Sequence, residues 1–392
     1  MHASTFLALF PLSLALAAPQ RRWVPAPLIV PRSAELVESK YIVKMYSDAK
    51  RSAVASAVSK IQADADFTYS RGFKGFAATL QPEELRKLRL NPSASHLSSP
   101  RLCSTTINSN TQQEDATWGL SRISSQQPGG TTYSYDESAG EGTCAYIIDT
   151  GVNAKDPDFE GRATFLKNFV EDDDDTDGNG HGTHVAGTIG SKTWGVAKKT
   201  KIFGVKVLDA YGSGRTSGVL AGMDFVTKDA VNQTCPKGAV VNMSLGGYKS
   251  KLVNDAAAAI TNAGLFLAVA AGNDGADAAN YSPASEPSAC TVGATSKDDK
   301  LAKYSNWGKV VDVLAPGSNI TSLWINGRSN RTISGTSMAS PHVAGIAAYF
   351  MGMGQPIAGL CDYIAKNALS GAISNVPNGT VNALINNGFK LE

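Results

Sequence analysis

Apolar and polar positions divide the chain into a long region of alternating strand and helix patterns and a shorter mixed region before it. In the long region, short runs of β-branched and aliphatic residues alternate with segments in which apolar residues recur at helical spacing. The runs predict strands over 144–148, 202–208, 239–243, 265–270, 291–294 and 310–314. The longer segments predict helices over 181–189, 217–230, 253–263, 336–351 and 357–368. Continuous apolar strands alternating with helices predict an α/β fold, a mainly parallel sheet with helices on both faces.

Polar and Gly-rich segments follow several of these predicted strands. They begin at Asp149, Ser244 and Gly272. Open parallel sheets bind their ligands beyond the carboxyl ends of their strands. We therefore expect these segments to contribute to a functional site at one edge of the sheet.

The shorter region, residues 40–105, has a pattern of its own. It predicts strands over 41–45, 67–69 and 76–80, a weak strand near 93–99, and helices over 48–61 and from Pro82 onward. This order is typical of a small ferredoxin-like α+β module. Residues 103–117 are polar and poor in apolar residues, as expected of a linker.

Charge separates the same two regions. Residues 1–110 carry 14 Lys+Arg and 7 Asp+Glu, whereas residues 111–392 carry 22 and 27, so the overall net charge of +2 hides segments of +7 and −5. A basic front module joined by a linker favours a pro-region, with an ordinary N-terminal binding domain as the alternative. Opposite charges would suit a segment that docks temporarily on the main body.

The first residues have the features of a secretory signal. Residues 6–18 are almost purely apolar but shorter than the roughly 20 residues that span a bilayer, and Ala15-Leu16-Ala17 forms a small-x-small cleavage pattern. A buried N-terminal helix is the alternative. No later apolar run reaches membrane length. We therefore expect a secreted, extracellular protein divided into a signal peptide (1–18), a propeptide (19–110) and a main domain (111–392).

Composition excludes several classes of protein. With 42% hydrophobic and 18% charged residues, the 392-residue chain is not expected to be disordered, coiled-coil or collagen-like. We expect no nucleic-acid or membrane partner, and a monomer.

Three Gly-rich segments carry the groups of a nucleophilic enzyme: IIDTG (147–151), GNGHGTHVAG (178–187) and SGTSMASPHVAG (334–345). A serine hydroxyl becomes a nucleophile when an imidazole removes its proton, and the imidazole needs a buried carboxylate to orient it. Asp149, His181 and Ser337 supply these groups. Singly, they could be a turn residue, a helix cap and a helix start. Together with their surroundings they form a specific signature.

The three segments resemble the Asp, His and Ser signatures of the subtilisin-like serine proteases, in the chain order of that family. Residues 118–124, 204–208 and 281–287 resemble its proteinase K branch. The likeness covers essentially all of residues 111–392, and residues 40–105 more weakly resemble the family's inhibitory, chaperone-like propeptide. The resemblance therefore implies a serine endopeptidase made as an autoprocessed zymogen, cleaved somewhere in residues 105–111, that hydrolyses proteins and peptides and is inhibited by its own propeptide.

The resemblance also implies a role for each site residue. Ser337 attacks the scissile carbonyl, His181 acts as general base and then acid, and Asp149 orients the imidazole. The side chain of Asn273 and the backbone N–H of Ser337 form the oxyanion hole. The substrate-binding segments are Gly212, Ser213 and Gly214; Ser244, Leu245 and Gly246; and the S1 wall of Ala270, Ala271 and Gly272. Main-chain recognition implies broad specificity, and the uncharged S1 wall favours apolar or aromatic P1 residues.

We also expect two disulfides and one calcium site in the main domain. Of five cysteines, the four in the main domain allow three pairings, and the resemblance implies Cys144–Cys235 and Cys290–Cys361, leaving Cys103 in the front piece or its linker. It also implies one structural Ca²⁺ held by Asp312 and the backbone carbonyls of Pro287 and Ala289. The family's weaker calcium site falls near Ala372, which has no side-chain oxygen, so we expect that site to be absent.

Several alternatives stay open. The acidic run 171–175 is either a solvated loop, the preferred interpretation, or a further ion site. His181 and His184 lack the spacing of a zinc-protease motif, and His342 reads as a packed helix residue. An inactive binding scaffold and an esterase are the rival functions. Six glycosylation sequons occur, of which Asn242 lies in a predicted buried strand.

Overall fold

The computed structural model describes residues 24–29, 39–62, 64–71, 73–98, 102–104, 108–109, 115–172, 174–326 and 329–388. The predicted signal peptide lies outside these ranges. Within them, no helix combines the length and the apolar character that crossing a membrane would require.

A nine-stranded sheet forms the centre of the main body, with the strand order β20-β21-β17-β16-β14-β12-β8-β10-β9. Its neighbouring strands are parallel except for β20 and β21, which confirms the mainly parallel sheet. The strands are β8 (Cys144–Asp149), β9 (Ala163–Asn168), β10 (Lys201–Lys206), β12 (Ala239–Met243), β14 (Phe266–Ala270), β16 (Cys290–Thr295), β17 (Val313–Pro316), β20 (Leu369–Ser370) and β21 (Ala383–Leu384).

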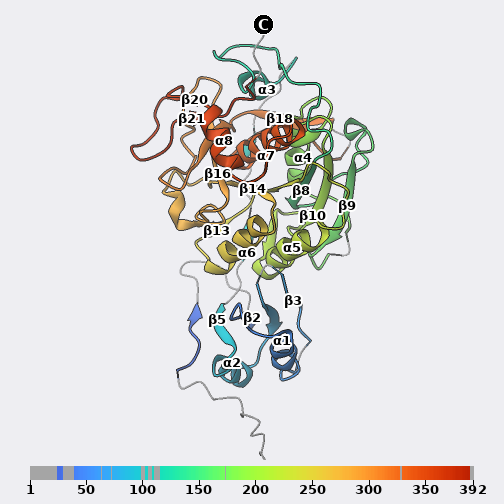
Figure 1. Ribbon diagram of the computed structural model, residues 1–392, viewed down its shortest axis with the longest axis vertical. Coiled ribbons are helices and arrows are strands. Elements are labelled where there is room, and N and C mark those ends of the chain that lie inside the picture. The colour runs from blue at the N-terminus through green and yellow to red at the C-terminus, as the bar shows by residue number, and fades with distance from the viewer. Residues whose placement is uncertain are drawn as a thin grey trace, which may run out of the picture.

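Helices cover both faces of this sheet, as predicted (Figure 1). Alternate residues of β8 show the two layers: Ala145 and Ile147 belong to the core beneath α4 and α7, whereas Tyr146 and Ile148 belong to the core beneath α5 and α6. The helices are α4 (His181–Gly190), α5 (Thr216–Asp229), α6 (Lys251–Asn262), α7 (Thr336–Gly352) and α8 (Leu360–Asn367).

Shorter elements lie around the sheet. They are α3 (Trp118–Arg122), β11 (Ser213–Arg215), β13 (Gly247–Tyr248), β15 (Tyr281–Ser282), β18 (Ile320–Leu323), β19 (Asn330–Ser334) and the 3₁₀ turns η1 (Pro157–Phe159) and η2 (Ala278–Asn280). The helix predicted over 357–368 begins only at Leu360, because Gly359 before it has a left-handed φ of 72°. The strand predicted over 310–314 is shifted to 313–316.

The front module has the predicted order of strands and helices: β2 (Lys40–Met45), α1 (Arg51–Val58), β3 (Phe67–Tyr69), β4 (Gly75–Thr79), α2 (Pro82–Arg89) and β5 (Ala94–Ser98), with β1 (Leu28–Ile29) added at one edge. Its sheet order is β1-β5-β2-β4-β3, and Val43, Phe76 and Leu97 contribute to a core of its own. Helix α1 begins after the predicted position 48. The turn before it is stabilised by the Lys74 ammonium, which donates to the carbonyls of Ser47 and Ala49.

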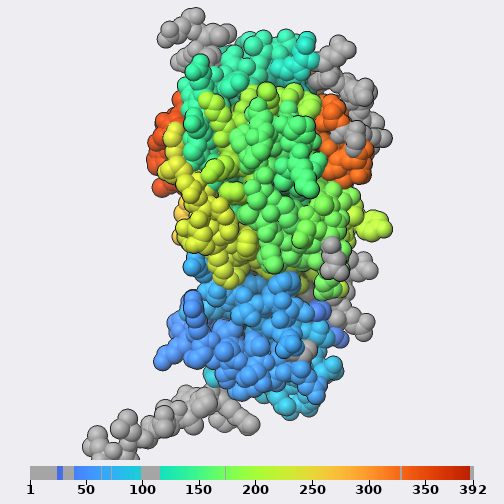
Figure 2. Space-filling model, turned by 90° about the vertical axis from the view of Figure 1, so that its right-hand side faces the viewer, coloured from blue at the N-terminus to red at the C-terminus, as the bar shows by residue number. Residues whose placement is uncertain are grey.

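The front module packs on the face of the main body that α5 and α6 form (Figures 1 and 2). Its residues Ile42, Tyr69, Phe73 and Ala77 share one apolar cluster with residues of these two helices. Beyond the module, β6 (Leu102–Ser104) pairs antiparallel with β11, and β7 (Asn108–Ser109) pairs antiparallel with β19. The connecting segment therefore adds strands to the main body on both sides of residues 105–107.

Candidate active site

Asp149, His181 and Ser337 lie at the ends of three elements. Asp149 is the last residue of β8, His181 is the first of α4, and Ser337 is the second of α7. The Oδ1 atom of Asp149 lies 2.7 Å from Nδ1 of His181, and both side chains are fully buried. The Nε2 atom of His181 has no hydrogen-bond partner among the described residues. The hydroxyl of Ser337 donates to the carbonyl of Ser244 at 3.2 Å.

The charge environment of His181 favours its protonated form. Burial lowers the pKa of the imidazole, but the charge and hydrogen bond of Asp149 and the charge of Asp177 outweigh it, so the pKa is raised above its ordinary value of 6.5. Nδ1–H donates to the carboxylate, which leaves Nε2 as the basic nitrogen. The pair can therefore accept a proton at Nε2 and stabilise the resulting cation.

The side-chain amide of Asn273 is held with its oxygen toward the first residue of α7. It lies just beyond β14, and its Oδ1 accepts the backbone N–H of Thr336 at 2.8 Å and the Thr336 hydroxyl at 3.0 Å. The Thr336 hydroxyl in turn accepts the N–H of Gly272 at 3.1 Å. These bonds fix the plane of the amide beside the N-terminus of α7. Thr336 was not singled out from the sequence.

A buried polar chain joins β12 to α7. Asn242 donates to the Ser244 hydroxyl at 2.9 Å, which donates to the carbonyl of Ser337 at 2.7 Å. Ser340 donates to Oδ1 of Asn242 at 2.7 Å. Because Asn242 is fully buried, its sequon is inaccessible in the folded chain, which agrees with the prediction.

The segments predicted to bind substrate differ in what they contact. Ser213 and Gly214 pair with Ser104 and Cys103 of β6, so this edge already takes up an extended strand of the same chain. In the 270–272 segment, Gly272 has φ of 105°, and a Cβ there would lie 2.3 Å from the side chain of Asn306.

The side chain of Asn306 holds the 270–272 segment in place by hydrogen bonds to the backbone. Its Nδ2 donates to the carbonyl of Ala271 at 3.0 Å, and its Oδ1 accepts the N–H groups of Asp274 and Ala276, each at 3.0 Å. Asn306 is fully buried and was missed from the sequence, because nothing in its own segment marks it.

Two further histidines are structural. His184 lies within hydrogen-bond distance of the carbonyls of Ile320 and Arg331, and His342 within that of Met338. Burial lowers the pKa of His184 to about 3 and that of His342 to about 4, so both are neutral packing residues. This agrees with the prediction for His342 and gives no support to a zinc site at His184.

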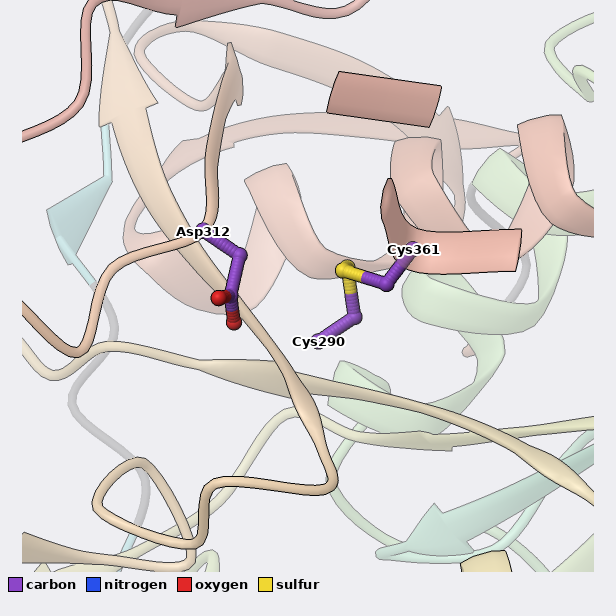
Figure 3. Close-up of side chains that lie close together, drawn as sticks. All are labelled: Cys290, Asp312 and Cys361. Atoms are coloured by element: carbon purple, nitrogen blue, oxygen red, sulfur yellow. A yellow bond between two sulfur atoms is a disulfide. The ribbon is translucent and has the colours of Figure 1, made fainter. Parts of the chain in front are cut away.

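Both disulfides implied by the resemblance are present, Cys144–Cys235 and Cys290–Cys361. Asp312 lies beside the second one (Figure 3). Cys290, Asp312 and Cys361 lie close enough to ligate one metal ion, but the two sulfur atoms are bonded to each other and are not available.

Asp312 nevertheless fits a hard cation. It lines a cavity of about 390 Å³ together with Pro287 and Ala289. One of its oxygens accepts the N–H of Thr291 at 2.7 Å. Burial raises the pKa of Asp312 to about 6, with the charge of Asp362 adding to the effect. A carboxylate that is costly to ionise beside a cavity is the kind of ligand that a bound cation would stabilise.

The acidic run is tied to the rest of the protein by ion pairs. Glu171 pairs with Arg215, and Asp172 with the ammonium of Lys206 at 3.2 Å. Lys206 is fully buried and also donates to the carbonyls of Thr150 and Leu208, at 3.3 and 3.1 Å. Glu171 and Asp172 of the acidic run therefore form ion pairs with basic residues, and Lys206 connects Asp172 to the loop after Asp149.

Comparisons with known proteins agree with this geometry. The profile of the Subtilase family matches residues 140–370. The chain is 53% identical to "Cuticle-degrading protease" of Metarhizium anisopliae, over 99% of this chain and all of the relative. It is 69% identical to "Proteinase T" of Parengyodontium album, over 70% of this chain and 94% of the relative. A crystal structure of a cold adapted subtilisin-like serine proteinase matches with a TM-score of 0.65 and 44% identity, covering 70% of this chain and 99% of that one.

Proposed function

Because the chain belongs to the subtilase family and is a serine endopeptidase, we propose that Asp149, His181 and Ser337 form its catalytic triad. The observation that carries this assignment is the buried 2.7 Å contact between Asp149 and Nδ1 of His181, at the sheet edge where the helix bearing Ser337 begins. The bond from Ser337 to the Ser244 carbonyl would be exchanged for one to Nε2 of His181, since catalytic hydrogen bonds often tighten only when substrate binds.

The reaction then proceeds in two halves. In acylation, Oγ of Ser337 attacks the scissile carbonyl carbon while Nε2 of His181 takes the hydroxyl proton. The tetrahedral intermediate collapses, the C–N bond breaks, and His181 returns the proton to the leaving amine. In deacylation, water attacks the acyl-enzyme, His181 takes a proton from it, and Ser337 leaves with that proton restored.

The oxyanion of each tetrahedral intermediate would lie between the amide N–H of Asn273 and the backbone N–H of Ser337. The bonds from Thr336 to the Asn273 carbonyl support this role, because they fix the plane of the amide. The N–H₂ group of the same amide has no hydrogen-bond partner among the described residues. Fixed donors need no reorganisation as charge develops, which is why such sites contribute strongly to catalysis.

Substrate peptides would bind as an added strand against residues 212–214 and 244–246. The pairing of β6 with β11 supports this mode, since main-chain bonds are available there to any extended segment. Recognition by main chain implies broad specificity. The uncharged wall at Ala270, Ala271 and Gly272 favours apolar or aromatic P1 residues.

The front region would serve as a signal peptide, removed on secretion, followed by an inhibitory propeptide. The pairing of residues 102–104 with β11 supports inhibition, because a strand there would compete with substrate. Docking on α5 and α6 supports a folding role for the module. Cleavage within residues 105–111 would separate it from the enzyme.

One structural Ca²⁺ would be held by Asp312 and the carbonyl oxygens of Pro287 and Ala289. When bound, the ion would supply positive charge that stabilises the ionised carboxylate and ties neighbouring loops together.

The triad assignment is tested with a fluorophosphonate probe on the processed protein. We expect it to label Ser337, and the variant Ser337→Ala to be neither labelled nor able to hydrolyse casein. Absence of labelling in folded, processed protein would overturn the assignment. Hydrolysis of short acyl esters without hydrolysis of casein would favour an esterase.

A further inference from the structure

A buried carboxylate outside the proposed triad, Asp177, lies just before α4. Asp177 is 5% exposed. Its Oδ1 accepts the Thr150 hydroxyl at 2.8 Å and the backbone N–H groups of Asn179 and Gly180 at 3.1 and 2.8 Å. Its Oδ2 accepts the N–H and the hydroxyl of Thr183 at 2.8 and 2.6 Å. Asp177 therefore joins five donors from two segments that are separate in the sequence.

The two threonine hydroxyls bonded to Asp177 cross between these segments. The hydroxyl of Thr150, in the loop after β8, accepts the N–H of Gly182 in α4 at 2.9 Å. The hydroxyl of Thr183, in α4, accepts the N–H of Asn153 in that loop at 2.9 Å. Each hydroxyl donates a hydrogen bond to Asp177 and accepts a hydrogen bond from a backbone N–H of the opposite segment. The carboxylate thus fixes the direction of both hydroxyls, and through them the spacing of the segments.

The same two segments carry Asp149 and His181. They approach so closely that a Cβ on Gly182 would lie 2.0 Å from the carbonyl oxygen of Gly151. A small shift of α4 along the loop would therefore change the Asp149–His181 contact directly. Displacements of about 1 Å in a catalytic constellation can reduce the rate about 100-fold.

We propose that Asp177 is a positioning residue, which acts through the hydroxyls of Thr150 and Thr183 to hold the Asp149 loop and the His181 helix in the register that catalysis requires. The inference rests on the proposed roles of Asp149 and His181. Asp177 acts at a distance as well, because its negative charge favours the imidazolium form of His181. Within the described ranges, the other ionisable groups whose charges interact with His181 are Asp149, which bonds to it, and His184 in the same helix, whose charge in turn interacts with that of His342 in α7.

The test compares isosteric pairs in the full precursor after processing. Thr150→Val and Thr183→Val each remove a hydroxyl and keep the shape, whereas Thr150→Ser and Thr183→Ser keep the hydroxyl. We expect each Val variant to lower kcat at least about tenfold with KM within about twofold, and each Ser variant to stay near the wild type. Thr188→Val is the matched control, because its buried hydroxyl lies in α4 but, among the residues that the structure describes, bonds only to the carbonyl of His184 at 3.1 Å.

Asp177→Asn adds a second readout. Removing the charge should move the acid limb of kcat/KM to lower pH, in addition to lowering kcat. Full kcat in both Val variants would overturn the proposal, and so would equal losses in the Val and Ser variants, which would indicate packing rather than hydrogen bonding. If Asp177→Asn does not fold, the threonine pairs decide the question alone.

Failure of the proposed function is distinguishable from failure of this inference. Fluorophosphonate titration counts the active sites in each preparation. A wild-type protein that is not labelled at Ser337 would reject the triad itself. A labelled wild type whose Thr→Val variants are equally active would reject only the positioning role.

Discussion

Tyr69 anchors the front module to the main body, and its substitution tests the zymogen arrangement directly. The side chain is 1% exposed, and its hydroxyl donates to the carbonyl of Ser217 in α5 at 3.2 Å. Its ring centroid lies 4.6 Å from that of Phe73. The ring belongs to the apolar cluster of α5 and α6 and not to the core of the module, so its burial depends on docking.

Two substitutions at Tyr69 separate the ring from its hydroxyl. Tyr69→Phe removes one hydrogen bond, worth about 1 kcal/mol, and should speed release of the module about fivefold. Tyr69→Ala removes a buried aromatic ring, worth about 3–5 kcal/mol, and should speed release by about 10² to 10³ or more. Because the hydroxyl bond and much of the ring's apolar surroundings belong to the main body, most of this effect should fall on the docked state.

The assay follows activity after the processed precursor is diluted into a chromogenic peptide. The lag before full activity reports release of the module, and fluorophosphonate titration corrects for the amount of folded enzyme. Leu90→Ala is the control, since that side chain is 37% exposed on the module. A wild-type lag in Tyr69→Ala, or a lag equally shortened by Leu90→Ala, would refute the docking of the module through this ring.

Four further outcomes are expected. Because His181 must be neutral to accept a proton and its pKa is raised, the acid limb of kcat/KM should have its midpoint above 6.5, and a midpoint below this value would contradict the assigned environment. Asn273→Ala should lower kcat by about 10² to 10³ with little change in KM, the range known for one such donor in a family relative; an unchanged kcat would exclude Asn273 from the oxyanion hole. A chelator should lower the Tm of the wild type and leave that of Asp312→Asn unchanged. If the ion is present at 100 times its Kd, the wild type should lose about 2.7 kcal/mol of stability, and an equal loss in both proteins would place the ion elsewhere. Replacing Cys290 and Cys361 by Ser opens a loop with a sequence separation of 71 and should cost about 4 kcal/mol in chemical unfolding, whereas a loss under 1 kcal/mol would mean that the unfolded chain gains little freedom.

The central strands could be predicted because burial on both faces requires continuous apolar runs, as in 144–148. Strand β9 was not predicted, since it lies at the edge of the sheet and its residues are partly buried or, like Lys167, exposed, and none is fully buried. The C-terminal strands β20 and β21 have only two residues each, too few to show a period.

The residues that support the site were harder to predict than the residues that carry its chemistry. Asp177 precedes a glycine and reads as a turn residue, because its partner Thr150 is 27 positions away. Asn306 has the sequence surroundings of a loop residue, because its partners Ala271 and Asp274 are more than 30 positions away. Lys206 did leave a signal, a lone charge within the apolar run 202–208, which indicates a buried cation with fixed partners.

The opposite net charges of the two regions are a poor explanation of how the front module is held. Lys44 of β2 does pair with Asp255 of α6. Burial, with the charge of Lys251, nevertheless lowers the pKa of Lys44 from 10.5 to about 8. Because Lys251 belongs to the main body, docking brings a like charge close to Lys44 and disfavours its cation, so the docked state should gain as pH rises through 8 toward 10.5. We therefore expect the apolar cluster around Tyr69 and Phe73 to supply most of the attraction, and added salt, which screens exposed charge pairs, to leave the docked state largely intact.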